Sequence, residues 1–248
     1  TGEGASLSSI GNVYADQGDY GEALSYHEES LAISRQVGDL TGEGASLSSI
    51  GNVYADQGNY GEALSYYEES LAISRQVGDR AGEGTTLNNI GLVYDNQGNY
   101  GEALSYYEES LAIRREVGDR AGEGTTLSNI GLVYGEQDEY EEAIAYYQQA
   151  LTIAQELGLR SSEGFRTYLI GTFYVDLARY SEALETLQQA FFIMQELGEE
   201  DRMQWVQEWM KDALDGIRDS GSAADYQQQC QAVSQTTDIP LVELCPAE

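Results

Sequence analysis

Apolar residues recur with helical spacing along the first 200 residues of the chain. In residues 43–57, Leu47, Ile50 and Tyr54 stand at positions i, i+3 and i+7, which places them on one side of a helix. The following stretch, 60–77, carries two apolar stripes, one formed by Tyr60, Ala63, Leu64, Tyr67 and Leu71 and the other by Tyr66, Ile73 and Val77. A helix that is apolar on two faces packs between neighbours, as in a stacked array.

This pair of helical segments repeats every forty residues, at 1–40, 41–80, 81–120, 121–160 and 161–200. The first two copies differ at only three positions. A fixed period of this size is typical of stacked repeat architectures. We therefore predict an all-α solenoid of five helical hairpins.

Glycine marks the boundaries of the predicted helices. Gly58 and Gly78 each follow the last residue of an apolar pattern, as a helix-ending glycine does. Asn59 and Glu62 have the spacing of a capping box, which predicts a side-chain cap on the second helix. Glycine also recurs inside the first helix, at positions 11, 51, 91, 131 and 171. It costs about 1 kcal/mol there relative to alanine, so its recurrence predicts close approach of the paired helix.

The repeat pattern decays after residue 200. Residues 201–235 are predicted to form a degenerate sixth helical pair that caps the array, with Trp205 or Trp209 packed on repeat five. Residues 236–248 contain both prolines, which predicts an extended tail. The apolar residues of this tail need a surface to cover, either on its own last helices or in a neighbouring copy. Cys230 and Cys245 are predicted to form either a disulfide or two free thiols.

The charge of the chain restricts its partners. Forty-three acidic residues against 12 basic ones give a net charge of −31. Such a surface repels phosphate backbones, which makes nucleic acid an unsuitable partner, and it favours neutral or basic ligands. The sequence contains no run of 18 apolar residues, so it predicts no membrane span. Because residue 1 already lies inside a repeat, we expect a fragment of a longer, cytoplasmic protein without a signal peptide.

The repeated motif resembles the tetratricopeptide repeat family. The residues that carry the resemblance are Leu47-x2-Ile50-Gly51-x2-Tyr54 followed by Ala63-x3-Tyr67. The forty-residue period and the Gly-Asp pair between repeats are similar to the Pins/LGN and kinesin-light-chain branch and to bacterial signalling proteins. The resemblance implies a right-handed superhelix whose first helices line a concave groove that binds a protein or peptide.

The groove positions implied by this resemblance are rich in asparagine, whose amide can donate to and accept from a peptide backbone. They are Asn12, Ser48, Asn52, Asn88, Asn89, Leu92, Asn96, Asn129, Leu132, Tyr168 and Thr172. The alternative is a merely solvated polar face. The family's carboxylate-clamping groove uses lysine and arginine, which these positions lack, so we expect a neutral or basic partner rather than an acidic one.

The sequence offers little for catalysis. His27 is the only histidine, and its counterparts in the second to fourth repeats are Tyr67, Tyr107 and Tyr147, so it is predicted to fill a packing position. Zinc-ligand spacing and phosphate-binding loops are absent from the sequence, and we expect neither an enzyme nor a bound cofactor or metal. Two functions remain: a non-catalytic scaffold that binds a protein or peptide, and a structural module that self-associates through its N-terminal end or its tail.

Overall fold

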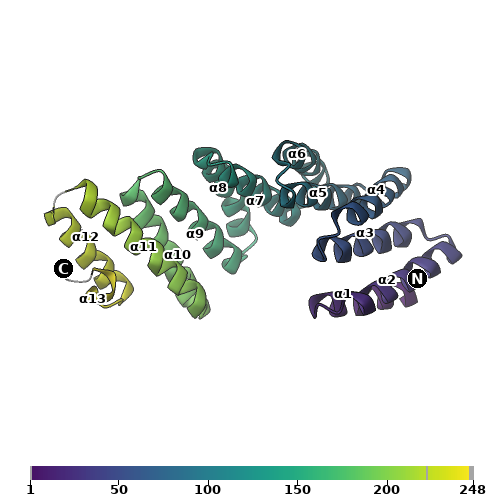
Figure 1. Cartoon of the computed structure of the whole chain (residues 1–248), viewed down its shortest axis with the longest axis horizontal. Helices are drawn as coiled ribbons and strands as arrows, with labels where there is room; N and C mark the ends of the chain where they lie inside the picture. The colour runs from purple at the N-terminus through teal and green to yellow at the C-terminus, as the bar shows by residue number, and fades with distance from the viewer. Residues whose placement is uncertain (1, 222, 246–248) are drawn as a thin grey trace. The chain divides into compact units, whose positions relative to one another are not determined.

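A computed structural model describes residues 2–221 and 223–245 (Figure 1). Within these residues every regular element is an α-helix, and the helices form successive hairpins, which confirms the predicted fold class. The chain divides into two compact units, Thr1–Thr126 and Leu127–Glu248. Each unit is described by itself.

The first unit consists of three helical hairpins and the beginning of a seventh helix. In each hairpin a first helix packs along a second one, and that second helix also contacts the first helix of the next hairpin. The helices are α1 (Gly2–Asp16), α2 (Tyr20–Val37), α3 (Leu40–Asp56), α4 (Tyr60–Val77), α5 (Arg80–Asn96), α6 (Tyr100–Val117) and α7 (Arg120–Glu136).

The recurring glycine allows the two helices of a hairpin to approach closely. A Cβ atom on Gly51 would lie 2.6 Å from the ring of Tyr67, and one on Gly91 would lie 2.8 Å from the ring of Tyr107. In the first hairpin, His27 occupies the tyrosine position over Gly11 and is buried. The steric reason predicted for this glycine is therefore present in the structure.

The prediction that Asn59 caps its helix is wrong. Its side chain makes no bond to the helix end, and its amide donates instead to Gln57 Oε1 at 3.1 Å. Side-chain caps occur at the other turn of the repeat, where Asp39 and Asp79 each accept from the backbone N–H three residues on, at 2.9 Å. Asp19 at the equivalent turn of the first repeat also forms no side-chain cap, and the two uncapped turns have a backbone ψ of 62° and 65°, against 84° and 82° at Asp39 and Asp79.

The second unit continues the hairpins and ends in a separate group of helices. Met194, Met210 and Val233 belong to its largest buried cluster. Trp209 packs against this cluster, whereas Trp205 is 48% exposed. The helices are α8 (Tyr140–Glu156), α9 (Arg160–Asp176), α10 (Tyr180–Leu197), α11 (Glu200–Ser220), α12 (Ala223–Thr237) and α13 (Leu241–Leu244).

The tail differs from the predicted extended segment. Helix α12 continues to Thr237, and residues 241–244 form the single helical turn α13 directly after Pro240. Proline is compatible with a helix start because the missing N–H would have no partner there. Ile239 and Leu244 are buried in the unit's own core, and Cys230 forms a disulfide with Cys245. The rest of the predicted tail, residues 246–248, lies outside the described residues.

Candidate peptide-binding site

The first helices of the hairpins carry most of the predicted site. In the first unit, α3 lies against both α1 and α5. Asn12 on α1, Asn52 on α3, and Leu92 and Asn96 on α5 are exposed, and Asn89 is half-buried. These adjacent helices therefore present polar side chains to solvent. Ser48 on α3 is half-buried and adds a hydroxyl to this face.

Asn52 and Asn89 form the best-defined pair on this face. The Oδ1 atom of Asn52 accepts from the Tyr67 hydroxyl at 2.7 Å and from Asn89 Nδ2 at 3.0 Å. These bonds leave Asn52 Nδ2 as a donor and Asn89 Oδ1 as an acceptor on neighbouring helices. A donor and an acceptor held in this way match the C=O and N–H groups of an extended peptide.

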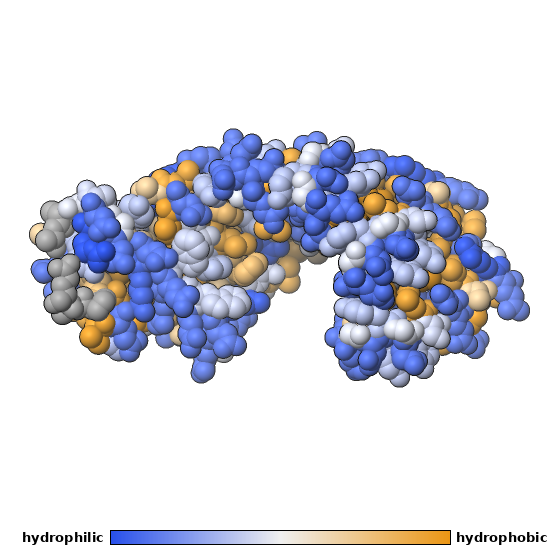
Figure 2. Space-filling model, viewed as in Figure 1, coloured by the Kyte–Doolittle hydropathy of each residue, from blue (hydrophilic) through white to orange (hydrophobic). Residues whose placement is uncertain are grey.

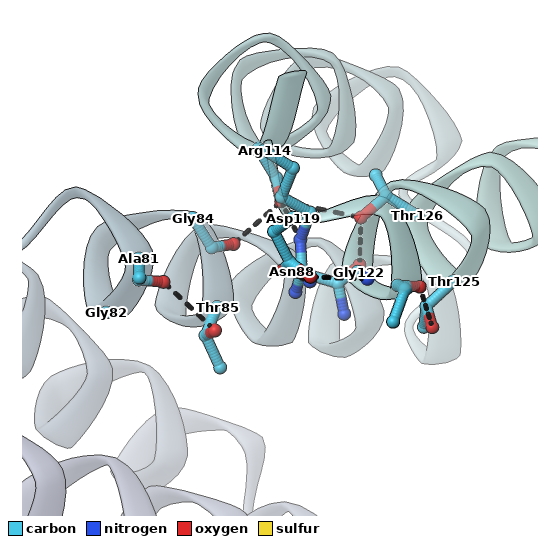
Figure 3. A network of polar contacts seen from close by, with 12 residues as sticks. Ala81, Gly82, Gly84, Thr85, Asn88, Arg114, Asp119, Gly122, Thr125 and Thr126 are labelled. Carbon is cyan, nitrogen blue, oxygen red and sulfur yellow. Dashed lines mark hydrogen bonds and ion pairs between the residues drawn. The ribbon is translucent and has the colours of Figure 1, made fainter. Parts of the chain in front are cut away.

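Two predicted site residues are buried and do not line the face. Asn88 is only 7% exposed, and its Oδ1 accepts from Thr126 Oγ1 at 3.0 Å (Figure 3). Beside it, Arg114 Nη1 donates to Asp119 Oδ2 at 2.8 Å, which places Asn88 in a structural network between helices. Thr172 is also buried and donates to the Leu169 carbonyl at 2.8 Å. Successive helical residues point about 100° apart, so Asn88 and Asn89 cannot share a face.

In the second unit the remaining predicted residues lie in different surroundings. Tyr168 packs against the buried cluster, where burial raises the pKa of its phenol. Asn129 and Leu132 on α7 instead line a pocket of about 380 Å³, together with residues of α9 and α11. Leu132, Phe165 and Leu169 supply its apolar surface, and Arg166 and Arg202 supply two guanidinium groups.

Hydrogen bonds position both arginines. Arg166 donates from Nε to Ser128 Oγ at 2.9 Å and from Nη1 to the Ser162 carbonyl at 3.2 Å. Burial lowers the pKa of Arg166. Arg202 lies 5.5 Å from the centre of the Phe165 ring, and its Nη1 donates to Ser161 Oγ and to Glu199.

The sequence predictions missed both arginines. Arg166 stands where the third and fourth repeats have Thr86 and Thr126, so a comparison of the fifth repeat with its neighbours carries that signal. Arg202 lies outside the five repeats, in the predicted degenerate sixth pair, whose first helix α11 contacts α9 as α3 contacts α1. The predicted groove positions themselves carry no lysine or arginine, and both arginines of this pocket lie at other positions.

The face seen in Figure 2 is largely hydrophilic, with apolar patches between the hydrophilic areas. In the part of the chain that the structure describes, three or more metal-ligating side chains do not come together in one place. Among the described helices, none has the combined length and apolarity that crossing a membrane requires.

Comparisons with known proteins identify the repeat. A family model described as tetratricopeptide repeat matches residues 3–76, 43–116 and 82–156. The chain belongs to the tetratricopeptide repeat family. Beyond those repeats, a model described as anaphase-promoting complex subunit 5 matches residues 160–215. None of the curated proteins matches the chain.

Solved structures share the fold of this tetratricopeptide repeat protein. The BtubC (BKLC) protein of P. vanneervenii is 18% identical, with a TM-score of 0.71 over 87% of this chain and 88% of that one. A signal transduction ATPase with a tetratricopeptide repeat sensor from Pyrococcus horikoshii is 21% identical, with a TM-score of 0.76 over 95% of this chain and 36% of that one. A Rap protein complexed with competence and sporulation factor is 14% identical, with a TM-score of 0.70 over 95% of this chain and 70% of that one.

Proposed function

We propose that this chain is a non-catalytic scaffold that binds an extended segment of a partner protein along the exposed faces of its first helices. The observation that carries the proposal is the Asn52–Asn89 pair, whose hydrogen bonds use Asn52 Oδ1 and Asn89 Nδ2 and leave one donor and one acceptor for a ligand backbone. The structurally similar Rap protein complexed with competence and sporulation factor supports the choice of a binding role.

The charge of the chain adds to this proposal. A net charge of −31 disfavours a strongly acidic partner and favours one that is neutral or basic overall. Asparagine amides bond peptide groups whatever the ligand sequence, so apolar residues such as Leu92 supply the side-chain selectivity.

The test begins with selection from a displayed library of random twelve-residue peptides on the whole chain. The affinities of the selected peptides are then measured by fluorescence anisotropy. We expect Asn89→Ala to weaken binding several-fold, because a bond to the ligand backbone and the bond that orients Asn52 are both lost. Asn99→Ala is the matched control, since Asn99 lies at a turn and donates to Gln97. Equal affinity of both variants would show a face that is only solvated.

A second candidate function is end-to-end self-association, favoured by the outer face of α1. Ile10 is 42% exposed and Val13 is 52% exposed, whereas their counterparts Ile50 and Val53 are at most 1% exposed beneath the preceding hairpin. Ile10 and Val13 thus occupy the positions by which later hairpins stack inside the first unit. Light scattering on the wild type and on Val13→Glu distinguishes the functions: a dimer that this change dissociates supports assembly, and a monomer contradicts it.

A further inference from the structure

His27 is a titratable side chain inside the helix packing of the first hairpin. It stands on α2 over Gly11 of α1, where a Cβ on the glycine would lie 2.7–2.9 Å from atoms of the imidazole ring. His27 is 1% exposed, and Ala23 and Leu31, about one helical turn to either side of it on α2, are also buried. The ring therefore fills the contact between the two helices and is shielded from water.

The imidazole differs from the phenol at the same position of the second hairpin in the partners of its polar atoms. There the Tyr67 hydroxyl donates to Asn52 Oδ1 at 2.7 Å. His27 Nδ1 is buried, and in the described part of the chain it has no hydrogen-bond partner. In a neutral imidazole Nδ1 can be the nitrogen without a proton, which needs no acceptor, whereas the imidazolium carries an N–H on both nitrogens. Protonation would therefore bury a charged donor without an acceptor, which is costly.

The helices packed against α2 are α1 and α3, so their charged groups could also act on the ring. The titratable groups of the three helices are Glu3, Tyr14 and Asp16 on α1, Tyr20, Glu22, Tyr26, Glu28, Glu29 and Arg35 on α2, and Glu43, Tyr54 and Asp56 on α3. All of these carboxylates are exposed except Glu43, which is half-buried and accepts from Arg35 at 2.7 Å. Exposed carboxylates are screened by water and stabilise a buried cation only weakly. Burial accordingly lowers the pKa of the His27 imidazole below its ordinary 6.5.

We propose that His27 makes the first hairpin a pH-sensitive element, closed while the imidazole is neutral and loosened when the imidazole is protonated. Protonation places an unpaired charge between α1 and α2, and separation of the two helices lets water reach it. The second and third hairpins carry Tyr67 and Tyr107 at this position, so they lack the response. The inference goes beyond the proposed function, because it concerns the closing of this hairpin whether or not the hairpin binds a peptide.

The lowered pKa of His27 gives the direction of the effect. The loosened hairpin takes up the proton at a higher pH than the closed one does. The stability contributed by the neutral ring is therefore complete above pH 6.5 and is lost as the pH falls from 6.5 through the folded-state pKa. Each unit by which closing lowers this pKa favours opening up to about tenfold more at acid pH.

The first measurement needs no substitution. His27 is the only histidine of the chain, so the ring C–H signal in a proton NMR spectrum belongs to it alone. We expect this signal, followed in the whole chain from pH 8 to pH 4, to titrate with a midpoint below 6.5. A midpoint at 6.5 or above would show that the closed hairpin tolerates the charge, and the proposal would be overturned.

Hydrogen exchange of the wild type and of His27→Tyr then shows whether the hairpin opens. Tyrosine already packs over the equivalent glycine of the second hairpin, so this variant should fold. Comparing the two proteins at the same pH removes the intrinsic pH dependence of exchange. We expect amides of α2 to exchange faster in the wild type by a ratio that rises several-fold from pH 7 to pH 5, while the ratio for α4 stays near one. A constant ratio in α2, or an equal rise in α4, contradicts a pH response confined to the first hairpin.

Transfer of the histidine to the second hairpin provides a further test. Tyr67→His is compared with Tyr67→Phe, which removes the same bond to Asn52 without adding a group that titrates. Amides of α4 should exchange faster in Tyr67→His than in Tyr67→Phe by a factor that grows several-fold from pH 7 to pH 5. A factor that does not change over this range would refute the role of a buried imidazole at this position.

Discussion

At the scale of single residues, two glycines of one hairpin have opposite surroundings. Gly91 faces Tyr107 at a distance that leaves no room for a Cβ, whereas Gly101 on α6 has no atom within 4 Å of that position. We expect Gly91→Ala to destabilise the protein by about 1–3 kcal/mol through overpacking. Gly101→Ala should stabilise it by up to about 1 kcal/mol, because alanine favours the helix. Urea unfolding measures both, and two changes of the same sign would refute the packing account.

The turn inside each hairpin provides a second test at this scale. Gly58 adopts a positive φ of 74°, and in the fifth repeat Ala178 takes the same position with a φ of 56°. This left-handed conformation costs an L-residue about 1–2 kcal/mol. Ala178→Gly should therefore raise the free energy of unfolding by about 1 kcal/mol, and Gly58→Ala should lower it by a similar amount. A loss of stability in Ala178→Gly would show that the alanine methyl makes a compensating contact.

Single residues also show where sequence reasoning succeeds and where it fails. The glycine at position 51 was interpretable because a costly residue recurred in one register, and the structure shows Tyr67 against it. Asn88 was misplaced because a polar residue inside a helical repeat suits a groove or a buried bond equally well. Only the contact with Thr126, which is distant in sequence, decides between them.

At the scale of elements, buried glutamates join neighbouring helices. Glu123 on α7 accepts from Arg115 on α6 at 2.7 Å and from Arg120 at 2.5 Å. Burial alone raises the pKa of Glu123, but the bonds from both guanidinium groups outweigh it, and the pKa is lowered below its usual 4.5. The carboxylate is therefore bound more favourably in the folded state than in the unfolded one.

This shift predicts a pH dependence for the junction of α6 and α7. A lowered folded-state pKa contributes stability above the unfolded value of about 4.5, and the contribution is lost as the pH falls through the folded value. Glu123→Gln should cost about 2 kcal/mol at neutral pH. The difference in the free energy of unfolding between this variant and the wild type should shrink below pH 4.5. Taking the difference at each pH cancels the effects of acid on the other carboxylates, which both proteins share. A difference that stays constant from pH 7 to pH 3 would contradict the role of the charge.

Helix boundaries are predictable where the signal is local in sequence and not where it depends on distant contacts. The range predicted for α4, 60–77, agrees with the structure because the apolar pattern and the following Gly78 are local signals. The turn α13 was not predicted, because its stability comes from burial of Leu244 in a core assembled from α10, α11 and α12. The pocket with Arg166 and Arg202 escaped prediction for the same reason.

At the scale of the whole molecule, repetition made the fold class predictable, since each hairpin needs only its neighbours to bury its apolar faces. The end of the chain is different. There α12 and α13 are not copies of earlier hairpins, yet they complete the largest buried cluster of the second unit. The Cys230–Cys245 disulfide links them across a separation of 15 residues.

The disulfide should hold this terminal group in place. Closing a loop of that length stabilises the folded state by about 3 kcal/mol in the chain-entropy description. We expect Cys245→Ser to lower the free energy of unfolding by about that amount in oxidising buffer, and to leave it nearly unchanged relative to the wild type in reducing buffer. Hydrogen exchange locates the effect. The amide of Cys245 donates to the Leu241 carbonyl at 2.8 Å, so amides 243–245 should exchange slowly only when α13 is docked. Random-coil exchange there in the oxidised wild type would rule out docking, and protection that rises with protein concentration would assign the tail to a neighbouring copy instead.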